Sequence, residues 1–127
     1  MSLDNPRCAV ALIMNDRGEI LAVSRKDNHE DLGLPGGKLE PRETFSDAVV
    51  REIEEEVGIR IVRMTAVFDH PDREFQAVTF LVHQWEGEPR SVEGAAVRWV
   101  SPSRLLTPEC SFRDYNQALF EHLCIVF

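Results

Sequence analysis

One short stretch constrains the fold and the chemistry of this chain more than any other. From position 36 to position 59 the sequence reads GGKLEPRETFSDAVVREIEEEVGI. It opens with two glycines, continues through a polar loop and then has the pattern of a helix. Thr44 is suited to cap the start of that helix, because its hydroxyl can accept a hydrogen bond from an exposed backbone N–H. Gly58 is suited to end the helix in the left-handed conformation.

The predicted helix has an apolar face with an acidic edge beside it. At about 100° per residue, one face carries the apolar residues Phe45, Val49, Ile53 and Val57. Glu52, Glu55 and Glu56 follow i, i+3, i+4 spacing and project beside that face. The alternative interpretation is an ordinary solvated acidic helix. If the acids are instead crowded at the edge of the core, a divalent cation would relieve their repulsion, and Mg²⁺ prefers such oxygen ligands.

The residues around this helix match a family motif position by position. Gly37, five residues, Glu43, seven residues and then the run REIEEEVGI beginning at Arg51 resemble the Nudix box of the Nudix hydrolases, without a departure. The match is specific because many positions are fixed over a short span. The resemblance implies an α+β Nudix fold with a mixed β-sheet sandwiched between helices. It also implies a single Nudix hydrolase domain over residues 1–127.

The resemblance further implies which residues bind metal and perform the chemistry. In the Nudix pattern, Mg²⁺ or Mn²⁺ is bound by box glutamates and by the carbonyl of the glycine before the box. The predicted metal ligands are therefore Gly36, Glu52, Glu55 and Glu56. The general base is either Glu52 or Glu93, a choice that the sequence leaves open. Arg51 is grouped with the catalytic residues because we expect it to orient a glutamate through a salt bridge, and Glu43 is expected to have a supporting role.

Composition and charge restrict the class of partner. The chain has 127 residues, of which 43% are hydrophobic, and a formal net charge of −8. A nucleic-acid polymer or an anionic membrane would require basic patches, so we expect a small-molecule nucleotide as the partner. We expect no membrane span, and a monomer or a homodimer. The three cysteines are far apart and form no CxxC pattern, which indicates a reducing, cytoplasmic setting.

Apolar runs and turn residues predict the remaining elements. The runs from Cys8 to Met14 and from Glu19 to Ser24 flank a turn and are expected to form a hairpin. A polar loop is expected from Lys26 to Asp31. Further strands are expected at Arg60–Phe68, Phe75–Trp85 and Ala96–Val100, with a turn at Asp69–Glu74 and a closing helix at about Phe112–Cys124.

The segment between the two tryptophans, Trp85 and Trp99, is similar to that of the MutT-type nucleoside triphosphate pyrophosphohydrolases. In those enzymes a glutamate at the position of Glu93 lies on a loop that faces the metals. This similarity favours hydrolysis of a nucleoside triphosphate, for example an oxidised purine nucleotide such as 8-oxo-dGTP, to a monophosphate and pyrophosphate. The alternatives are a hydrolase of another nucleoside diphosphate derivative, such as a sugar nucleotide, and a sensor domain without catalysis. A sensor would be favoured by loss of box glutamates, and none is lost.

Candidate substrate-binding residues lie outside the box. Phosphate or base contacts are expected from cations near the metal segment, a base pocket needs apolar walls, and amide or carboxylate groups can read a base edge. The predicted substrate-binding residues are Arg25, Lys26, Leu34, Lys38, Phe75, Asp114 and Asn116. Phe112 is a further candidate wall. For each aromatic residue the alternative is an ordinary place in the core.

Overall fold

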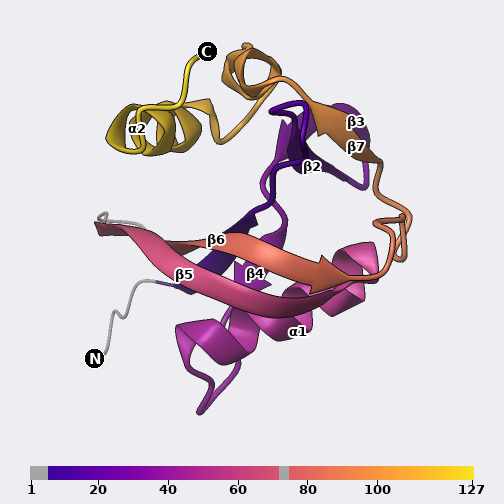
Figure 1. The fold of residues 1–127 in the computed structure, drawn as a ribbon, viewed down its shortest axis with the longest axis vertical. Coiled ribbons are helices and arrows are strands. Elements are labelled where there is room, and N and C mark those ends of the chain that lie inside the picture. Colours follow the sequence, from indigo (N-terminus) through magenta and orange to yellow (C-terminus); the bar gives the residue numbers. More distant parts are fainter. Residues whose placement is uncertain (1–5, 72–74) are drawn as a thin grey trace.

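The structure is a computed structural model that describes residues 6–71 and 75–127. Figure 1 shows the order of the elements along the chain. They are β1 (Arg7–Leu12), β2 (Ile20–Arg25), β3 (Asn28–Gly33), β4 (Gly36–Lys38), α1 (Phe45–Val57), β5 (Arg60–Pro71), β6 (Gln76–Glu86), β7 (Val97–Val100), the 3₁₀-helix η1 (Pro102–Leu106) and α2 (Arg113–His122).

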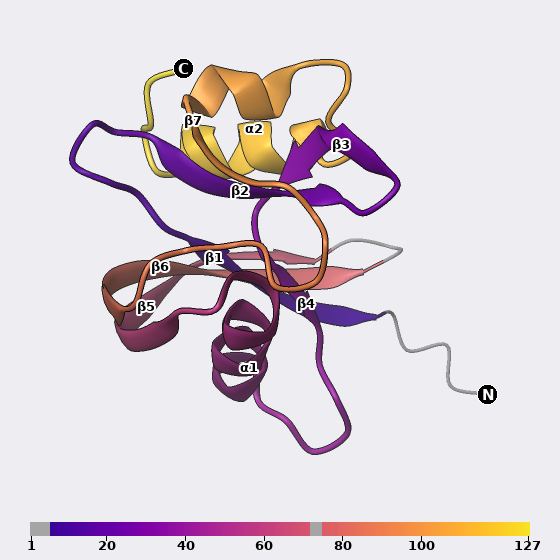
Figure 2. The same ribbon diagram turned by 90° about the vertical axis from the view of Figure 1, so that its right-hand side faces the viewer.

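The strands form two sheets that lie between helices. One sheet has the order β4-β1-β6-β5 and the other has the order β3-β2-β7. The four-stranded sheet is mixed, because β1 pairs antiparallel with β4 but parallel with β6. Figure 2 shows α1 on one side of this sheet, and the three-stranded sheet with α2 on the other side. The predicted α+β architecture, with a mixed sheet between helices, is confirmed.

Alternating side chains on the central strands build a separate core on each face of the four-stranded sheet. On β1, Ala9 and Ala11 are buried with the apolar face of α1. Their neighbours Val10 and Leu12 pack on the opposite side with residues of α2. Because side chains on a strand point alternately to its two faces, a strand covered on both faces is apolar at nearly every position. This explains the continuous apolar run at the start of the chain.

Both ends of α1 are fixed by the residues expected from the sequence. The hydroxyl of Thr44 accepts a hydrogen bond of 3.0 Å from the backbone N–H of Asp47, and the Asp47 carboxylate accepts one of 3.2 Å from the N–H of Thr44. Gly58 ends the helix with φ of 70°, where a side chain would be strained. These contacts set the register in which the acidic residues of α1 face the sheet.

The predicted hairpin between the first two strands is wrong. The chain turns where expected, and the N–H of Leu21 donates to the carbonyl of Ile13 at 2.9 Å. Beyond this point, β1 and β2 enter different sheets. The edges of β1 are already paired with β4 and β6, so β2 pairs with β3 and β7 instead.

The predicted polar loop from Lys26 to Asp31 is also wrong over most of its length, because β3 begins at Asn28 and pairs antiparallel with β2. Pairing with an available strand edge overrides the low strand propensity of this polar segment. Asp31, the last residue of that predicted polar loop, is only 7% exposed.

The remaining predictions from the sequence mostly agree with the structure. The later strands and the closing helix lie within a few residues of their predicted bounds. The turn expected at Asp69–Glu74 is not seen at its start, since β5 continues to Pro71, and positions 72–74 lie outside the described residues. Among the described residues, none of the helices combines the length and the apolar character needed to cross a bilayer.

Candidate active site at the glycine strand

Two glutamates of α1 lie against the short strand β4. Oε2 of Glu56 accepts a hydrogen bond of 3.1 Å from the backbone N–H of Gly36. A Cβ atom built on Gly37 would lie 2.5 Å from the carboxyl carbon of Glu52. A Cβ atom on Gly36 would collide with the backbone of Ala9 and Val10. Glycine is therefore required at position 36 by the neighbouring backbone, whereas a side chain at position 37 would displace the Glu52 carboxylate.

Negative charge is concentrated around Glu56. Burial raises the pKa of its carboxyl well above the ordinary value, and the neighbouring acids Glu52 and Glu93 raise this pKa further. The hydrogen bond from Gly36 acts in the opposite direction without cancelling the effect. Carboxylates that repel one another in a partly buried position are stabilised by a hard divalent cation, which prefers oxygen ligands. The chemistry of this donor set thus fits the cation expected from the sequence.

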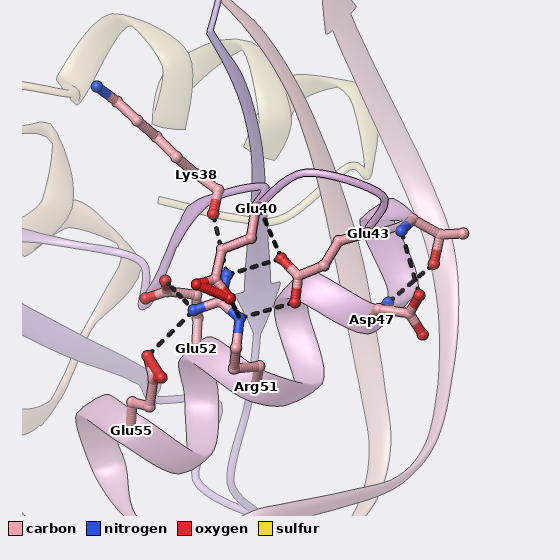
Figure 3. A network of polar contacts seen from close by, with 8 residues as sticks. Lys38, Glu40, Glu43, Asp47, Arg51, Glu52 and Glu55 are labelled. Atoms are coloured by element: carbon pink, nitrogen blue, oxygen red, sulfur yellow. Dashed lines mark hydrogen bonds and ion pairs between the residues drawn. The ribbon is translucent and has the colours of Figure 1, made fainter.

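Arg51 links the acids of α1 to the loop before the helix, as Figure 3 shows. Its guanidinium binds Glu43 in a bidentate manner, with Nε 2.7 Å from Oε2 and Nη2 2.8 Å from Oε1. Nη1 donates to Glu52 at 2.7 Å and to Glu55 at 3.1 Å, and Nη2 donates to the carbonyl of Lys38 at 3.1 Å. The salt bridge expected between Arg51 and a box glutamate is therefore present, and Glu43 holds Arg51 in place.

A cavity of about 420 Å³ opens beside these acids. Glu56 and Glu93 contribute acidic groups to its lining, and Arg25 and Lys26 contribute basic groups. The four residues come from α1, from the end of β2 with the turn after it, and from the loop before β7. The structure thus brings together predicted phosphate-binding and acid–base residues that are far apart in the sequence.

The loop that carries Glu93 is attached to the carboxyl end of α1. The N–H of Arg90 donates to the carbonyl of Val57 at 3.0 Å, and the N–H of Val92 donates to that of Glu56 at 3.3 Å. These bonds satisfy carbonyl groups that the last turn of a helix leaves without intrahelical partners. The same bonds hold Glu93 on the side of the helix from which Glu56 projects.

A second cavity of about 300 Å³ lies where β4 meets α2. The predicted residues that line it are Leu34, Lys38, Phe75 and Asn116, together with Phe112. Its lining also includes Gly36 and Gly37, so the same short backbone borders this cavity and contacts the acids of α1. Most residues that line this cavity are apolar, and Asn116 contributes a carboxamide. This composition is expected of a small-molecule site.

The final helix contributes differently from the sequence-based expectation. Asp114 is exposed and does not belong to the lining of either cavity, whereas Asn116 is 1% exposed and donates from Nδ2 to the carbonyl of Leu105 at 3.1 Å. Sequence analysis missed Tyr115, which lines the second cavity. The spacing of Phe112, Tyr115 and Asn116 is i, i+3, i+4, and this helical periodicity was the signal that could have identified it.

Burial raises the pKa of Tyr115 to about 12, so its hydroxyl stays protonated near neutral pH. That hydroxyl lies 2.5 Å from Oγ1 of Thr79 in the interior of the sheet. The aromatic ring of Tyr115 also packs against Phe68, His70 and Phe75. Tyr115 is thus a rigid part of the cavity wall, anchored to β6 on one side.

Comparison with known proteins places this arrangement in a family. The model of the NUDIX domain matches residues 4–119. The chain is 41% identical over 100 residues to the 8-oxo-dGTP diphosphatase of Escherichia coli (strain K12), a match that covers 73% of this chain and 78% of that protein. The chain belongs to the Nudix family. This confirms the family predicted from the sequence and the assignment to its pyrophosphohydrolases.

Two further Nudix relatives show how widely the similarity extends. The CTP pyrophosphohydrolase of Escherichia coli (strain K12) is 34% identical over 105 residues, covering 76% of this chain and 77% of that protein. The crystal structure of a MutT NUDIX hydrolase from Burkholderia pseudomallei superposes with a TM-score of 0.75 at 35% identity. That superposition covers 91% of this chain and 97% of the other, and it confirms the Nudix fold.

Nudix hydrolases generally depend on a divalent metal. Within residues 6–71 and 75–127, however, no group of three or more His, Cys, Asp or Glu side chains is placed so that it could hold a metal ion. Glu52 and Glu56 approach one another at β4, whereas the side chain of Glu55 is 48% exposed and contacts Arg51. This is compatible with Mg²⁺, which is usually bound by one or two carboxylates, water and substrate phosphates.

The Glu43–Arg51 contact predicts a pH dependence of stability for this Nudix domain. The hydrogen bond from Arg51 is the largest cause that lowers the pKa of Glu43, from 4.5 to about 2. Its stabilising contribution is complete above pH 4.5 and is lost as the pH falls toward 2, because the unfolded chain then binds a proton that the folded chain does not. The difference in free energy of unfolding between wild type and Glu43→Gln should shrink over this range.

Urea unfolding at a series of pH values measures this difference. Glu54→Gln is the matched control, since Glu54 is an exposed residue of the same helix, and its difference from wild type should vary little with pH. A Glu43→Gln difference that stays constant from pH 5 to pH 3 would contradict the assigned role of the pair.

Proposed function

We propose that this Nudix domain is a Mg²⁺-dependent pyrophosphohydrolase that converts an oxidised purine nucleoside triphosphate, such as 8-oxo-dGTP, to the monophosphate and pyrophosphate. The observation that carries the proposal is the shared border at β4. An acidic site that suits a metal and phosphates lies on one side of this strand, and an apolar cavity of about 300 Å³ lies on the other. A nucleotide requires both environments next to each other.

The proposed ligands of Mg²⁺ or Mn²⁺ are the carbonyl of Gly36 and the carboxylates of Glu52, Glu55 and Glu56. When bound, such a cation neutralises phosphate charge and orients the reacting groups. Glu55 contacts Arg51 in the structure, so its participation requires a different side-chain rotamer. Glu52 and Glu56 already face β4, and their mutual repulsion supports cation binding at this position.

The chain's own residues supply the remaining requirements of the reaction. The oxygens of a phosphoanhydride repel an incoming nucleophile, so catalysis depends on charge neutralisation and on positioning. Arg25 and Lys26 provide positive charge in the acidic cavity. A water molecule attacks one of the two phosphorus atoms of the α–β anhydride and gives its proton to Glu52 or Glu93, while the electron pair of the broken P–O bond leaves with the other phosphate group. Arg51 holds Glu52 in position for this step.

The second cavity is proposed to bind the base. Leu34 and Phe75 provide apolar walls, and Lys38 contributes a positive charge to the lining of the same cavity. Asn116 donates to the carbonyl of Leu105, which orients its carboxamide and leaves the oxygen to accept from a base. Guanine carries a lone pair at N7, and 8-oxoguanine carries an N–H there instead. A fixed acceptor therefore favours the oxidised base. Relatives named 8-oxo-dGTP diphosphatase support the same substrate.

The proposed setting is the cytoplasm. Cys8, Cys110 and Cys124 are all free thiols, and the formal net charge of −8 disfavours binding to polyanionic surfaces. Both features suit a domain that acts on a small nucleotide in a reducing compartment.

A screen of canonical and oxidised nucleotides with Mg²⁺ tests the substrate. The expected result is the highest kcat/KM on 8-oxo-dGTP, with monophosphate and pyrophosphate identified by chromatography. Release of a sugar phosphate from a sugar nucleotide, or a preference for CTP over every oxidised purine, would contradict the proposal. The second outcome would match the name of one relative, the CTP pyrophosphohydrolase.

Replacement of Glu56 tests the acidic site directly. Glu56→Gln keeps a side chain of similar size but removes the charge next to Gly36, and kcat should fall by about 10²–10⁴-fold in Mg²⁺. Glu54→Gln changes an exposed residue two positions away and should leave kcat within about 2-fold of wild type. Near-normal turnover of Glu56→Gln would contradict the assigned role.

A further inference from the structure

A buried carboxylate connects β3 to the start of α2. Oδ1 of Asp31 accepts a hydrogen bond of 2.8 Å from the backbone N–H of Ser111, and Oδ2 accepts one of 2.5 Å from the Ser111 hydroxyl. Asp31 is only 7% exposed, so breaking this pair would leave buried polar groups without partners. The two residues are 80 positions apart in the sequence, and neither has a role in the proposed reaction.

The position of this contact matters because α2 has no side-chain cap of its own. Its N-cap residue is Phe112, which makes no side-chain capping hydrogen bond. The Asp31 carboxylate, supplied from a different element, lies directly before this helix start, where negative charge interacts favourably with the helix dipole. Asp31 does not cap the helix itself, because its partner Ser111 precedes the N-cap residue, but it fixes the chain segment that leads into α2.

Phe112 is the part of the cavity wall that depends most on this contact. It is 53% exposed, whereas the neighbouring wall residues Tyr115 and Asn116 are held by burial. Phe112 lies against β3, because a Cβ atom built on Gly33 would be 3.6 Å from its Cδ2 atom. Because about half of Phe112 is exposed, burial alone fixes this residue less firmly than Tyr115 and Asn116.

A second contact supports the same segment. Nη2 of Arg104 donates to the backbone carbonyl of Glu30 at 2.8 Å, and Nη1 lies 3.4 Å from the sulfur of Cys110. The chain between η1 and α2 is therefore attached to β3 at two neighbouring residues, Glu30 and Asp31. Of these two attachments, only the one at Asp31 reaches the residue immediately before Phe112.

We infer that Asp31 is a positioning residue for base recognition: its contact with Ser111 fixes Phe112 as one wall of the 300 Å³ cavity. The inference rests on the proposed function, because it assumes that this cavity binds the base. A single strand then organises one side of the cavity. It supplies the attachment at Asp31, the surface under Phe112 at Gly33 and, directly after its end, the wall residue Leu34.

Steady-state kinetics of the full chain with Mg²⁺ and 8-oxo-dGTP test this inference. Asp31→Ala should raise KM by about 10-fold and leave kcat within about 2-fold, because it disturbs the base wall and not the acids of α1. Asp31→Asn should restore most of the wild-type KM, since its carboxamide can still accept from the Ser111 N–H. His29→Ala, an exposed change on the same strand, should leave KM unchanged within about 2-fold.

A double-mutant cycle separates positioning from general destabilisation. In a Phe112→Ala background, Asp31→Ala should raise KM by no more than about 2-fold, because the group that it positions is already absent. A full 10-fold increase in that background, or an unchanged KM for Asp31→Ala alone, would overturn the inference. If Asp31→Ala does not fold, Ser111→Ala takes its place in the cycle, with a smaller increase of about 3-fold expected and the same criterion.

Titration with 8-oxo-dGMP, measured by calorimetry without turnover, distinguishes the two levels of the argument. If the wild-type chain neither hydrolyses 8-oxo-dGTP nor binds 8-oxo-dGMP, the proposed function fails, and the inference fails with it. If the wild type does both and Asp31→Ala binds the monophosphate as tightly as wild type, only the positioning role is overturned. A Kd raised by about 10-fold for Asp31→Ala is the expected result.

Discussion

The close packing of two α1 glutamates against the backbone of β4 is the constraint on which the site depends. A side chain at Gly36 would collide with the backbone of β1, one at Gly37 would displace the Glu52 carboxylate, and the N–H of Gly36 donates to Glu56. This contact joins the helix to the four-stranded sheet at the point where β4 also borders the apolar cavity. The small size of the two glycines thus keeps the acidic and apolar sites next to one another.

The glutamates of this arrangement repel one another, and neighbouring residues reduce this repulsion only in part. Glu56 is partly buried close to Glu52 and Glu93, and like charges in such a position repel one another. Arg51 offsets part of the charge on Glu52 and is itself held by Glu43. Arg51 does not contact Glu56 among the described hydrogen bonds, so the Glu56 carboxyl lacks this neutralising partner. A cation would have most to gain at that position.

Much of the site could be predicted from the sequence because its chemistry is local. The caps at Thr44 and Gly58 and the spacing of the α1 glutamates follow from helix geometry alone. The predictions that were wrong concern elements whose structure depends on strands that are distant in the sequence. Whether Asn28–Gly33 forms a loop or a strand is decided by the free edge of β2, and the separation of β1 from β2 is decided by β6. Neither strand pairing can be predicted from the composition of the segment itself.

The same distinction explains the residues that were missed. Asp31 is polar and lies in a charged run, so its burial becomes visible only when Ser111 is placed beside it. Tyr115 could have been identified from its helical spacing with Phe112 and Asn116. Asp114 was predicted instead because its carboxylate can read a base edge, but it lines neither cavity. Local patterns thus predicted the acids of α1 and several residues that line the second cavity, whereas the buried contact of Asp31 required the tertiary structure.

Binding of Mn²⁺ in the presence of a non-hydrolysable nucleotide, measured by electron paramagnetic resonance, tests whether the acids at β4 hold the metal. We expect the wild-type chain and Glu54→Gln to bind Mn²⁺ with similar affinity, and Glu56→Gln to bind it about 10–100-fold more weakly. Equal Mn²⁺ affinity in all three proteins would show that the acids at β4 do not hold the metal, and the account of the site would be wrong.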